Sequence, residues 1–215
     1  MSIEFTGERV IPGQTDAVLM KRHYMRYQAI LSACEGKVVM DIPCGTGYGA
    51  HLLKCHGAAC VVAVDNDKKT LDYACGNFWL PRIQFTHGDM TAIGAFGTGV
   101  WKLEHYDVIV CFEGIEHVHH EDGENLIEVF GHLLKPRGTL FLSTPNKDTS
   151  QSKVGKDEFH KHEYGYAELM DLIYPHFTDP ILCGQLNEGE PDVIHVDPNL
   201  ALPDNFFVEA KRRRG

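Results

Sequence analysis

Short apolar runs recur along the chain, and each is about as long as one β-strand. They occupy residues 37–42, 60–64, 83–86, 106–112 and 139–143, and most are rich in valine and isoleucine. None of them alternates cleanly between apolar and polar positions, which is typical of strands that are buried on both faces. The runs therefore predict a parallel sheet that is covered on both sides.

Helices are predicted between these runs. Residues 121–134 carry apolar side chains at helical spacing, and Pro136 and Gly138 follow as residues that end a helix. Further helices are predicted at residues 15–33, 47–54, 68–78 and 166–173. The alternation of strands and helices favours a doubly wound, Rossmann-like α/β fold.

The last part of the chain predicts two more strands, at residues 177–186 and 205–210, that form an antiparallel pair at the edge of the sheet. An acidic segment, residues 187–203, lies between them and is predicted to be a long loop. The expected architecture is therefore a seven-stranded, mostly parallel sheet with an antiparallel last strand.

Charge and composition restrict the partners. The 215 residues include 20 Lys and Arg against 30 Asp and Glu, so the net charge is −10, which disfavours non-specific binding of nucleic acid. The apolar runs fall short of the about 18 residues of a membrane-spanning helix, and the first residues lack the order of a signal peptide. The seven cysteines form no CxxC pair. We therefore expect a cytoplasmic protein with reduced thiols and no membrane partner.

A glycine-rich turn follows the first predicted strand. It begins at Asp41 and contains Gly45, Thr46 and Gly47 directly before a predicted helix, which is where open α/β sheets bind nucleotides. The glycine spacing differs from that of the dinucleotide fingerprint, and the lysine of a Walker A loop is absent. Asp65 ends the second predicted strand, where a carboxylate is suited to accept both hydroxyls of a ribose.

These residues, within 38–146, resemble the class I S-adenosylmethionine-dependent methyltransferases. The first motif of that family, an acidic residue followed by alternating glycines, maps onto Asp41, Gly45 and Gly47, and Pro43 stands where the family usually has its first glycine. The resemblance implies S-adenosylmethionine as the cofactor. It also divides the chain into an N-terminal segment and helix that cover the cofactor site (1–36) and a methyltransferase domain (37–215).

The resemblance also implies individual cofactor contacts. It assigns Asp65 to the ribose, Asp89 to the adenine amino group, Met90 to the adjoining wall, and Phe112 to packing along the cofactor, and it counts Asn66 among the cofactor-binding residues. The resemblance also implies that Thr46 of the glycine turn contacts the cofactor. For Asp89, a carboxylate that only stabilises a turn is the alternative.

The predicted N-terminal helix contains Arg26. In ubiquinone-pathway O-methyltransferases, an arginine at a comparable place meets the cofactor carboxylate, and the resemblance implies this role for Arg26 because a guanidinium pairs well with a carboxylate. The alternative is an ordinary charge on the surface of a helix.

Two carboxylates and an imidazole follow the fourth predicted strand, as Glu113, Glu116 and His117. Burying such groups is costly without a chemical role. Two interpretations remain open. Either His117 is a general base that takes the proton of a substrate hydroxyl, or the three side chains bind Mg²⁺ or Mn²⁺, which lowers the pKa of that hydroxyl.

A later histidine pair offers one more metal ligand. His160 and His162 follow the fifth predicted strand, and the whole pattern resembles the small-RNA 3′-terminal 2′-O-methyltransferases, in which a later histidine joins the metal site. Ubiquinone-pathway and glycan O-methyltransferases are similar too. By position His162 matches that ligand better than His160, and the alternative is that both are solvent-facing loop residues.

The expected function is therefore methyl transfer to a hydroxyl of a small molecule, such as a sugar or glycan. A hydroxyl is a poor nucleophile that needs a base or a metal, and the motif typical of N-methylation is absent. An RNA 3′ end ranks second because the chain is acidic. The third alternative is a protein that binds S-adenosylmethionine without catalysis. The sequence predicts no oligomeric state.

Overall fold

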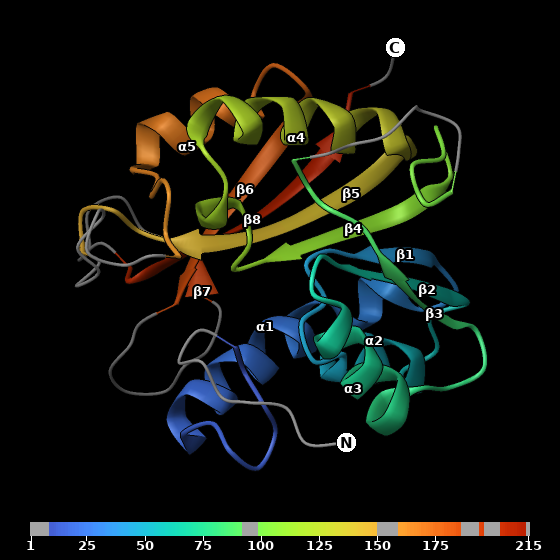
Figure 1. The fold of residues 1–215 in the computed structure, drawn as a ribbon. Coiled ribbons are helices and arrows are strands. Elements are labelled where there is room, and N and C mark those ends of the chain that lie inside the picture. The colour runs from blue at the N-terminus through green and yellow to red at the C-terminus, as the bar shows by residue number, and fades with distance from the viewer. Residues whose placement is uncertain (1–8, 92–98, 150–158, 186–193, 196–202, 214–215) are drawn as a thin grey trace.

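The computed structural model describes residues 9–91, 99–149, 159–185, 194–195 and 203–213. One sheet organises these residues, and its strands follow the order β3-β2-β1-β4-β5-β8-β6-β7 (Figure 1). The strands are β1 (Val38–Asp41), β2 (Cys60–Asp65), β3 (Ile83–His87), β4 (Tyr106–Phe112), β5 (Leu134–Pro145), β6 (Phe177–Gln185), β7 (Ile194–His195) and β8 (Asn205–Arg212). The helices are α1 (Ala17–Cys34), α2 (Tyr48–Cys55), α3 (Lys68–Phe78), the 3₁₀-helix η1 (Ile115–His117), α4 (His120–Leu133) and α5 (Tyr166–Ile173).

The predicted Rossmann-like sheet is confirmed. Strands β1 to β5 are parallel to one another, and β8 runs antiparallel between β5 and β6. The structure adds one short strand, β7, which pairs with β6 inside the segment that was expected to be a loop. β5 also starts earlier than predicted, because Leu134 already pairs with Tyr106. Lys135 precedes Pro136, and the residue before a proline disfavours the helical conformation, so α4 ends at Leu133.

Both faces of the sheet are covered, as the apolar runs predict. α4 and α5 lie on one face, and α1, α2 and α3 lie on the other (Figure 1). Adjacent residues of β1 show the alternation, because Val39 packs into the core under α1–α3 and Met40 packs into the core under α4 and α5. No helix within the described ranges is both long and apolar enough to span a membrane.

A glycine of α4 makes room for a buried tyrosine. A Cβ at Gly123 would collide with the hydroxyl of Tyr164, whose side chain is fully buried. We expect Gly123→Ala to lower the free energy of unfolding by about 1–3 kcal/mol, as overpacking does. Denaturant titration measures the change.

Gly131 on the same helix is the matched control, because the nearest atom to a Cβ there would be 3.7 Å away, an ordinary contact with His176. Gly131→Ala should leave the free energy of unfolding unchanged or raise it by up to about 1 kcal/mol. An equal loss in both variants would contradict the packing argument.

Candidate active site

A cavity of about 710 Å³ opens where the parallel strands β1, β2 and β4 end. Its size suits a small ligand, since such pockets measure roughly 300–1,000 Å³. The predicted site residues that line it are Pro43, Gly45, Thr46, Asp65, Asn66, Met90, Phe112, Glu113, Glu116 and His117. Other predicted residues are described by the structure but lie outside this lining, namely Arg26, Asp41, Gly47, Asp89 and His162.

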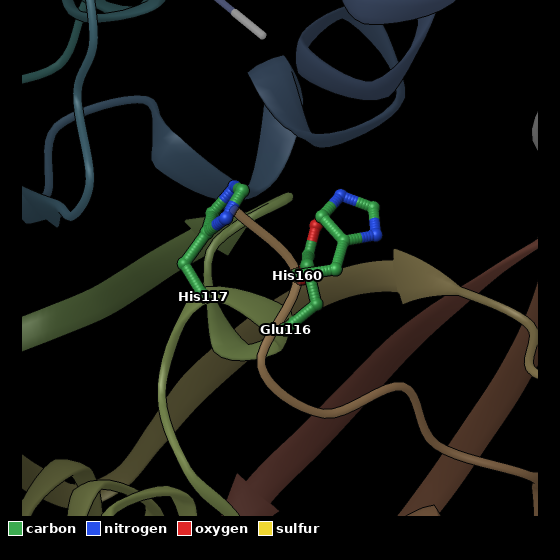
Figure 2. Close-up of side chains that lie close together, drawn as sticks. All are labelled: Glu116, His117 and His160. Carbon is green, nitrogen blue, oxygen red and sulfur yellow. The ribbon is translucent and has the colours of Figure 1, made fainter. Parts of the chain in front are cut away.

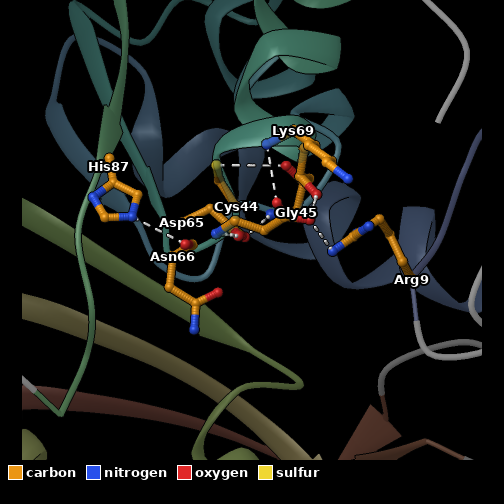
Figure 3. Close-up of polar contacts among 9 residues, drawn as sticks. Arg9, Cys44, Gly45, Asp65, Asn66, Lys69 and His87 are labelled. Carbon is orange, nitrogen blue, oxygen red and sulfur yellow. Dashed lines mark hydrogen bonds and ion pairs between the residues drawn. The ribbon is translucent and has the colours of Figure 1, made fainter. Parts of the chain in front are cut away.

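The glycine turn is held in place by the carboxylate of Asp65. The backbone N–H of Gly45 donates to Asp65 Oδ2 at 2.9 Å, and that of Asp67 donates to Oδ1 at 3.0 Å (Figure 3). Gly45 and Gly47 both have positive φ, +51° and +84°, and Gly47 caps α2. Asp65 therefore fixes the turn against the end of β2 while it faces the cavity.

Asp41 lies behind this turn rather than in the cavity wall. Its side chain is fully buried, and Tyr27 donates its hydroxyl to Asp41 Oδ1 at 3.0 Å. Oδ2 has no hydrogen-bond partner among the described residues. Burial raises the pKa of Asp41 to about 7, so the carboxyl resists ionisation.

This raised pKa predicts a pH dependence. The pKa of this carboxyl is 3.8 in the unfolded chain and about 7 in the folded protein. Its contribution to the free energy of unfolding is therefore complete below pH 3.8, where both states are protonated, and is lost as the pH rises through about 7. Asp41→Asn cannot titrate and can still accept the Tyr27 hydrogen bond. We expect the free energy of unfolding to fall with pH more steeply in the wild type than in Asp41→Asn, by up to about 1.4 kcal/mol per pH unit between pH 4 and 7. Denaturant titrations across that range measure both slopes, and equal slopes would contradict the assignment.

Glu116, His117 and His160 form a cluster at the other end of the cavity. Their ligand atoms all lie within 4.8 Å of one another, and Figure 2 shows the two rings on either side of the carboxylate. η1 supplies Glu116 and His117, and the segment after β5 supplies His160. Glu116 is 1% exposed and accepts a hydrogen bond from Thr144 Oγ1 at 3.0 Å. Burial, together with the charge of Glu113, raises the pKa of Glu116 to about 8.

Both histidines of the cluster are anchored through Nδ1. His117 Nδ1 lies 3.1 Å from the carbonyl oxygen of Phe159, and His160 Nδ1 lies 2.8 Å from Glu163 Oε1. Since each partner atom is an acceptor, each Nδ1 is placed to donate to it, and Nε2 is the nitrogen on the other side of the ring. Metal-binding histidines show this pattern, in which the other ring nitrogen donates to a carbonyl or a carboxylate.

The expected placement of His162 in this cluster is wrong. The backbone N–H groups of Lys161 and His162 both donate to the carbonyl of Glu116, at 2.8 and 3.1 Å, and fix the segment there. His160 then reaches Glu116, while His162 lies against Glu168, with Nε2 at 2.6 Å from Oε1. The two histidines are two residues apart, and the local backbone rather than their spacing decides which one meets the cluster.

Glu113 faces away from the cluster. Its Oε1 accepts a hydrogen bond from Ser143 Oγ at 2.8 Å and lies 3.4 Å from Arg26 Nη1, and its Oε2 accepts one from Asn205 Nδ2 at 2.9 Å. Its backbone has φ +48°, which turns the chain sharply after β4. The predicted grouping of Glu113 with Glu116 and His117 as metal ligands is therefore not seen, because protein donors already hold its carboxylate.

Arg26 supports Glu113 instead of lining the cavity. It is 2% exposed, and its Nε donates to Gln185 Oε1 at 3.0 Å. The alternative of a surface charge is wrong because Arg26 is buried, and its contact with a cofactor carboxylate stays a prediction. Asp89 likewise lies outside the cavity wall, where its Oδ1 accepts hydrogen bonds from the backbone and hydroxyl of Thr91.

Residues 39–138 match the family model of a methyltransferase domain. A Mycolicibacterium smegmatis protein named "probable S-adenosylmethionine-dependent methyltransferase" is 32% identical over 177 residues, which cover 80% of this chain and 64% of that protein. Residues 39–138 therefore form a methyltransferase domain that is similar to those of S-adenosylmethionine-dependent enzymes. The chain spans less than two thirds of the length of this relative.

Other relatives and solved structures agree with this methyltransferase fold. A ubiquinone biosynthesis O-methyltransferase of Coxiella burnetii is 30% identical over 116 residues, 53% of this chain and 46% of that protein. The structure of an S-adenosylmethionine-dependent methyltransferase from Mesorhizobium loti superposes with a TM-score of 0.69 at 17% identity, covering 91% of this chain and all of that one. The magnesium protoporphyrin IX methyltransferase of Synechocystis, solved with bound S-adenosylhomocysteine, gives 0.67 at 18% identity, covering 94% and 90%.

The cavity of the methyltransferase domain fits S-adenosylmethionine. A Cβ built on Gly45 would meet nothing within 4 Å, so the backbone there borders open space that a ligand can approach closely. Asp65 and Asn66 offer acceptors at the end of β2, and Phe112 and Met90 offer apolar surface.

Some cavity residues were not predicted. Arg9 lines the cavity and donates to Asp67 Oδ2 at 2.7 Å (Figure 3). His23 also lines it, and its Nδ1 lies 3.1 Å from Tyr48 Oη. Burial, with the charges of Arg26 and Arg22, holds the pKa of His23 well below its usual value, so the ring is neutral. His23 lies one helical turn before Tyr27, which also lines the cavity, so the two residues share one face of α1.

Proposed function

We propose that this methyltransferase transfers a methyl group from S-adenosylmethionine to a hydroxyl oxygen of a small molecule, with a divalent cation held by Glu116, His117 and His160. The supporting observation is that one cavity is lined by both the glycine turn and this cluster. S-adenosylmethionine supplies a methyl group on a positively charged sulfur, which is already activated for displacement. The protein then has to align the acceptor and help remove its proton.

The nucleotide end of the cavity binds and orients. The turn at Gly45 admits the ligand close to the backbone, and Asp65 and Asn66 offer acceptors for the ribose hydroxyls. Phe112 is 6% exposed and packs edge-on against Tyr27 at a ring-centroid distance of 5.1 Å, which makes a firm apolar wall.

The cluster end handles the acceptor proton. A divalent cation would polarise a hydroxyl and lower its pKa. Burial and the charge of Glu113 raise the pKa of Glu116, and a cation bound beside it would favour the ionised carboxylate. His117 Nε2 and His160 Nε2 add two imidazole nitrogens to the donor set, which suits a transition-metal dication such as Mn²⁺ with water in the remaining positions.

A sugar or glycan with neighbouring hydroxyls is the acceptor class that this end of the cavity favours. A cation can hold two adjacent hydroxyl oxygens at once. Phe159 is 44% exposed at the cavity edge and offers an aromatic face to a sugar ring. The net charge of −10 disfavours the RNA alternative, because an RNA enzyme needs a basic surface.

The proposal is tested by transfer of a ¹³C-labelled methyl group from S-adenosylmethionine to methyl glycosides, ribonucleosides, phenols and amines. The chemical shift of the product shows whether the label lies on oxygen, nitrogen or sulfur. We expect an O-methyl product from a vicinal diol that needs added Mn²⁺. A product methylated on nitrogen would contradict the proposal. O-methylation that survives a chelator would refute the cation and leave His117 as the base.

A further inference from the structure

A second group of metal-ligating residue types lies beyond Glu116, His117 and His160, which are called the catalytic cluster below. It lies where the segment 159–164 crosses the N-terminal ends of α4 and α5. His120 is the first residue of α4, Glu168 lies in the first turn of α5, and His162 comes from the crossing segment. Their ligand atoms lie within 4.8 Å of one another, and all three residues are partly exposed. The crossing segment thus contributes one histidine to each group.

The two ring nitrogens converge on a single carboxylate oxygen. Glu168 Oε1 lies 2.6 Å from His162 Nε2 and 3.5 Å from His120 Nε2. Ligand atoms of a tetrahedral zinc site lie about 3.3 Å apart, so a cation needs only a small opening of the shorter contact. The charged neighbours lie on other atoms, since Lys147 Nζ is 3.8 Å from Glu168 Oε2 and Glu124 Oε1 is 3.8 Å from His120 Nδ1.

A buried aromatic ring backs this group. Tyr164 is fully buried, and its ring centroid lies 4.7 Å from that of His162 and 6.0 Å from that of His120. The group therefore combines two imidazoles, one carboxylate and a rigid wall.

We propose that His120, His162 and Glu168 form a second metal site, selective for zinc-class transition-metal dications and distinct from the catalytic cluster. Two imidazoles and one carboxylate are the ligand set of many zinc sites, and imidazole ligands disfavour Mg²⁺. A cation there ties the crossing segment to α4 and α5. If the proposed function is correct, it also fixes His160, because Lys161 and His162 hold the carbonyl of Glu116 through the same segment.

The test uses the untagged full chain without cofactor. His117→Gln removes a ligand of the catalytic cluster, and Co²⁺ titrated into this variant reports metal binding through its visible absorption. We expect one equivalent to bind, excess Mg²⁺ to leave it in place, and the added change His120→Gln or Glu168→Gln to abolish it. Gln at 168 can still accept the hydrogen bond from the Gly165 backbone, so α5 keeps its cap.

His132→Gln is the matched control, because His132 lies on the same helix with a 53% exposed side chain. This control should keep the full equivalent of Co²⁺. Hydrogen exchange at the amides of Lys161 and His162 should slow when the metal binds. The proposal is overturned if His117→Gln binds no Co²⁺, or if binding survives both His120→Gln and Glu168→Gln. It is also overturned if His132→Gln loses as much Co²⁺ binding as these variants do. Since His117→Gln lacks one ligand of the catalytic cluster and the readout is Co²⁺ binding, these outcomes are independent of methyl transfer.

Discussion

Glu116→Gln is expected to lower the turnover of methyl transfer by a factor of about 10²–10⁴, the range that assistance to proton removal contributes. Glu116 is the carboxylate of the catalytic cluster and lies 1% exposed beside His117 and His160. Glutamine keeps the size and can still accept the hydrogen bond of Thr144, but it cannot carry the negative charge that a cation needs. Steady-state kinetics with the acceptor found by ¹³C labelling measures the loss.

The affinity for S-adenosylhomocysteine separates this effect from damage to the fold. It should be unchanged in Glu116→Gln, because the residues assigned to the nucleotide, Gly45 and Asp65, lie on other elements. Glu128→Gln is the matched control on α4, since the Glu128 side chain is 55% exposed and should not affect turnover. Full turnover in Glu116→Gln, or an equal fall in cofactor affinity, would contradict the role of the cluster.

Substituting alanine for the two glycines of the turn should have different effects: Gly45→Ala should mainly weaken cofactor binding, and Gly47→Ala should mainly lower stability. At Gly45 a Cβ meets nothing within 4 Å. Gly45→Ala should therefore lower the free energy of unfolding only through the strain of its left-handed backbone, by about 1–2 kcal/mol. The methyl group would enter the cavity, and we expect the affinity for S-adenosylhomocysteine to fall by at least about tenfold, or 1.4 kcal/mol. Calorimetric titration measures this loss.

Gly47 packs against the protein instead. A Cβ there would lie 2.7 Å from Ala74 Cβ and 2.8 Å from the ring of Phe85, at φ +84°. We expect Gly47→Ala to lower the free energy of unfolding by roughly 2–6 kcal/mol, through strain and overpacking together. If Gly45→Ala binds the cofactor normally, or if Gly47→Ala keeps full stability, the placement of the turn is wrong.

The sheet could be predicted because its strands are buried on both faces. Runs such as residues 106–112 are mostly apolar because their side chains are buried in the cores on both faces of the sheet. The glycine turn marks the end of β1 directly in the sequence. β7 could not be predicted, since two paired residues within an acidic segment carry no periodic signal.

The details of the site depended on contacts that no local pattern reveals. Glu113 is held by Asn205, 92 residues further along the chain, which only the pairing of β5 with β8 brings near. The choice between His160 and His162 depends on where the Glu116 carbonyl holds the backbone. The burial of Arg26 did leave a signal, because Ile30 and Cys34 follow it at four-residue spacing on the buried face of α1.

The proposed function places the methyl end of the cofactor in the same cavity as Glu116, His117 and His160. The most direct test is the ¹³C resonance of methyl-labelled S-adenosylmethionine bound to the protein, recorded as Mn²⁺ is added without an acceptor. A paramagnetic ion in the cluster should broaden this resonance strongly in the wild type and not in Glu116→Gln. A resonance that stays sharp in the wild type, or broadens equally in Glu116→Gln, would contradict the account.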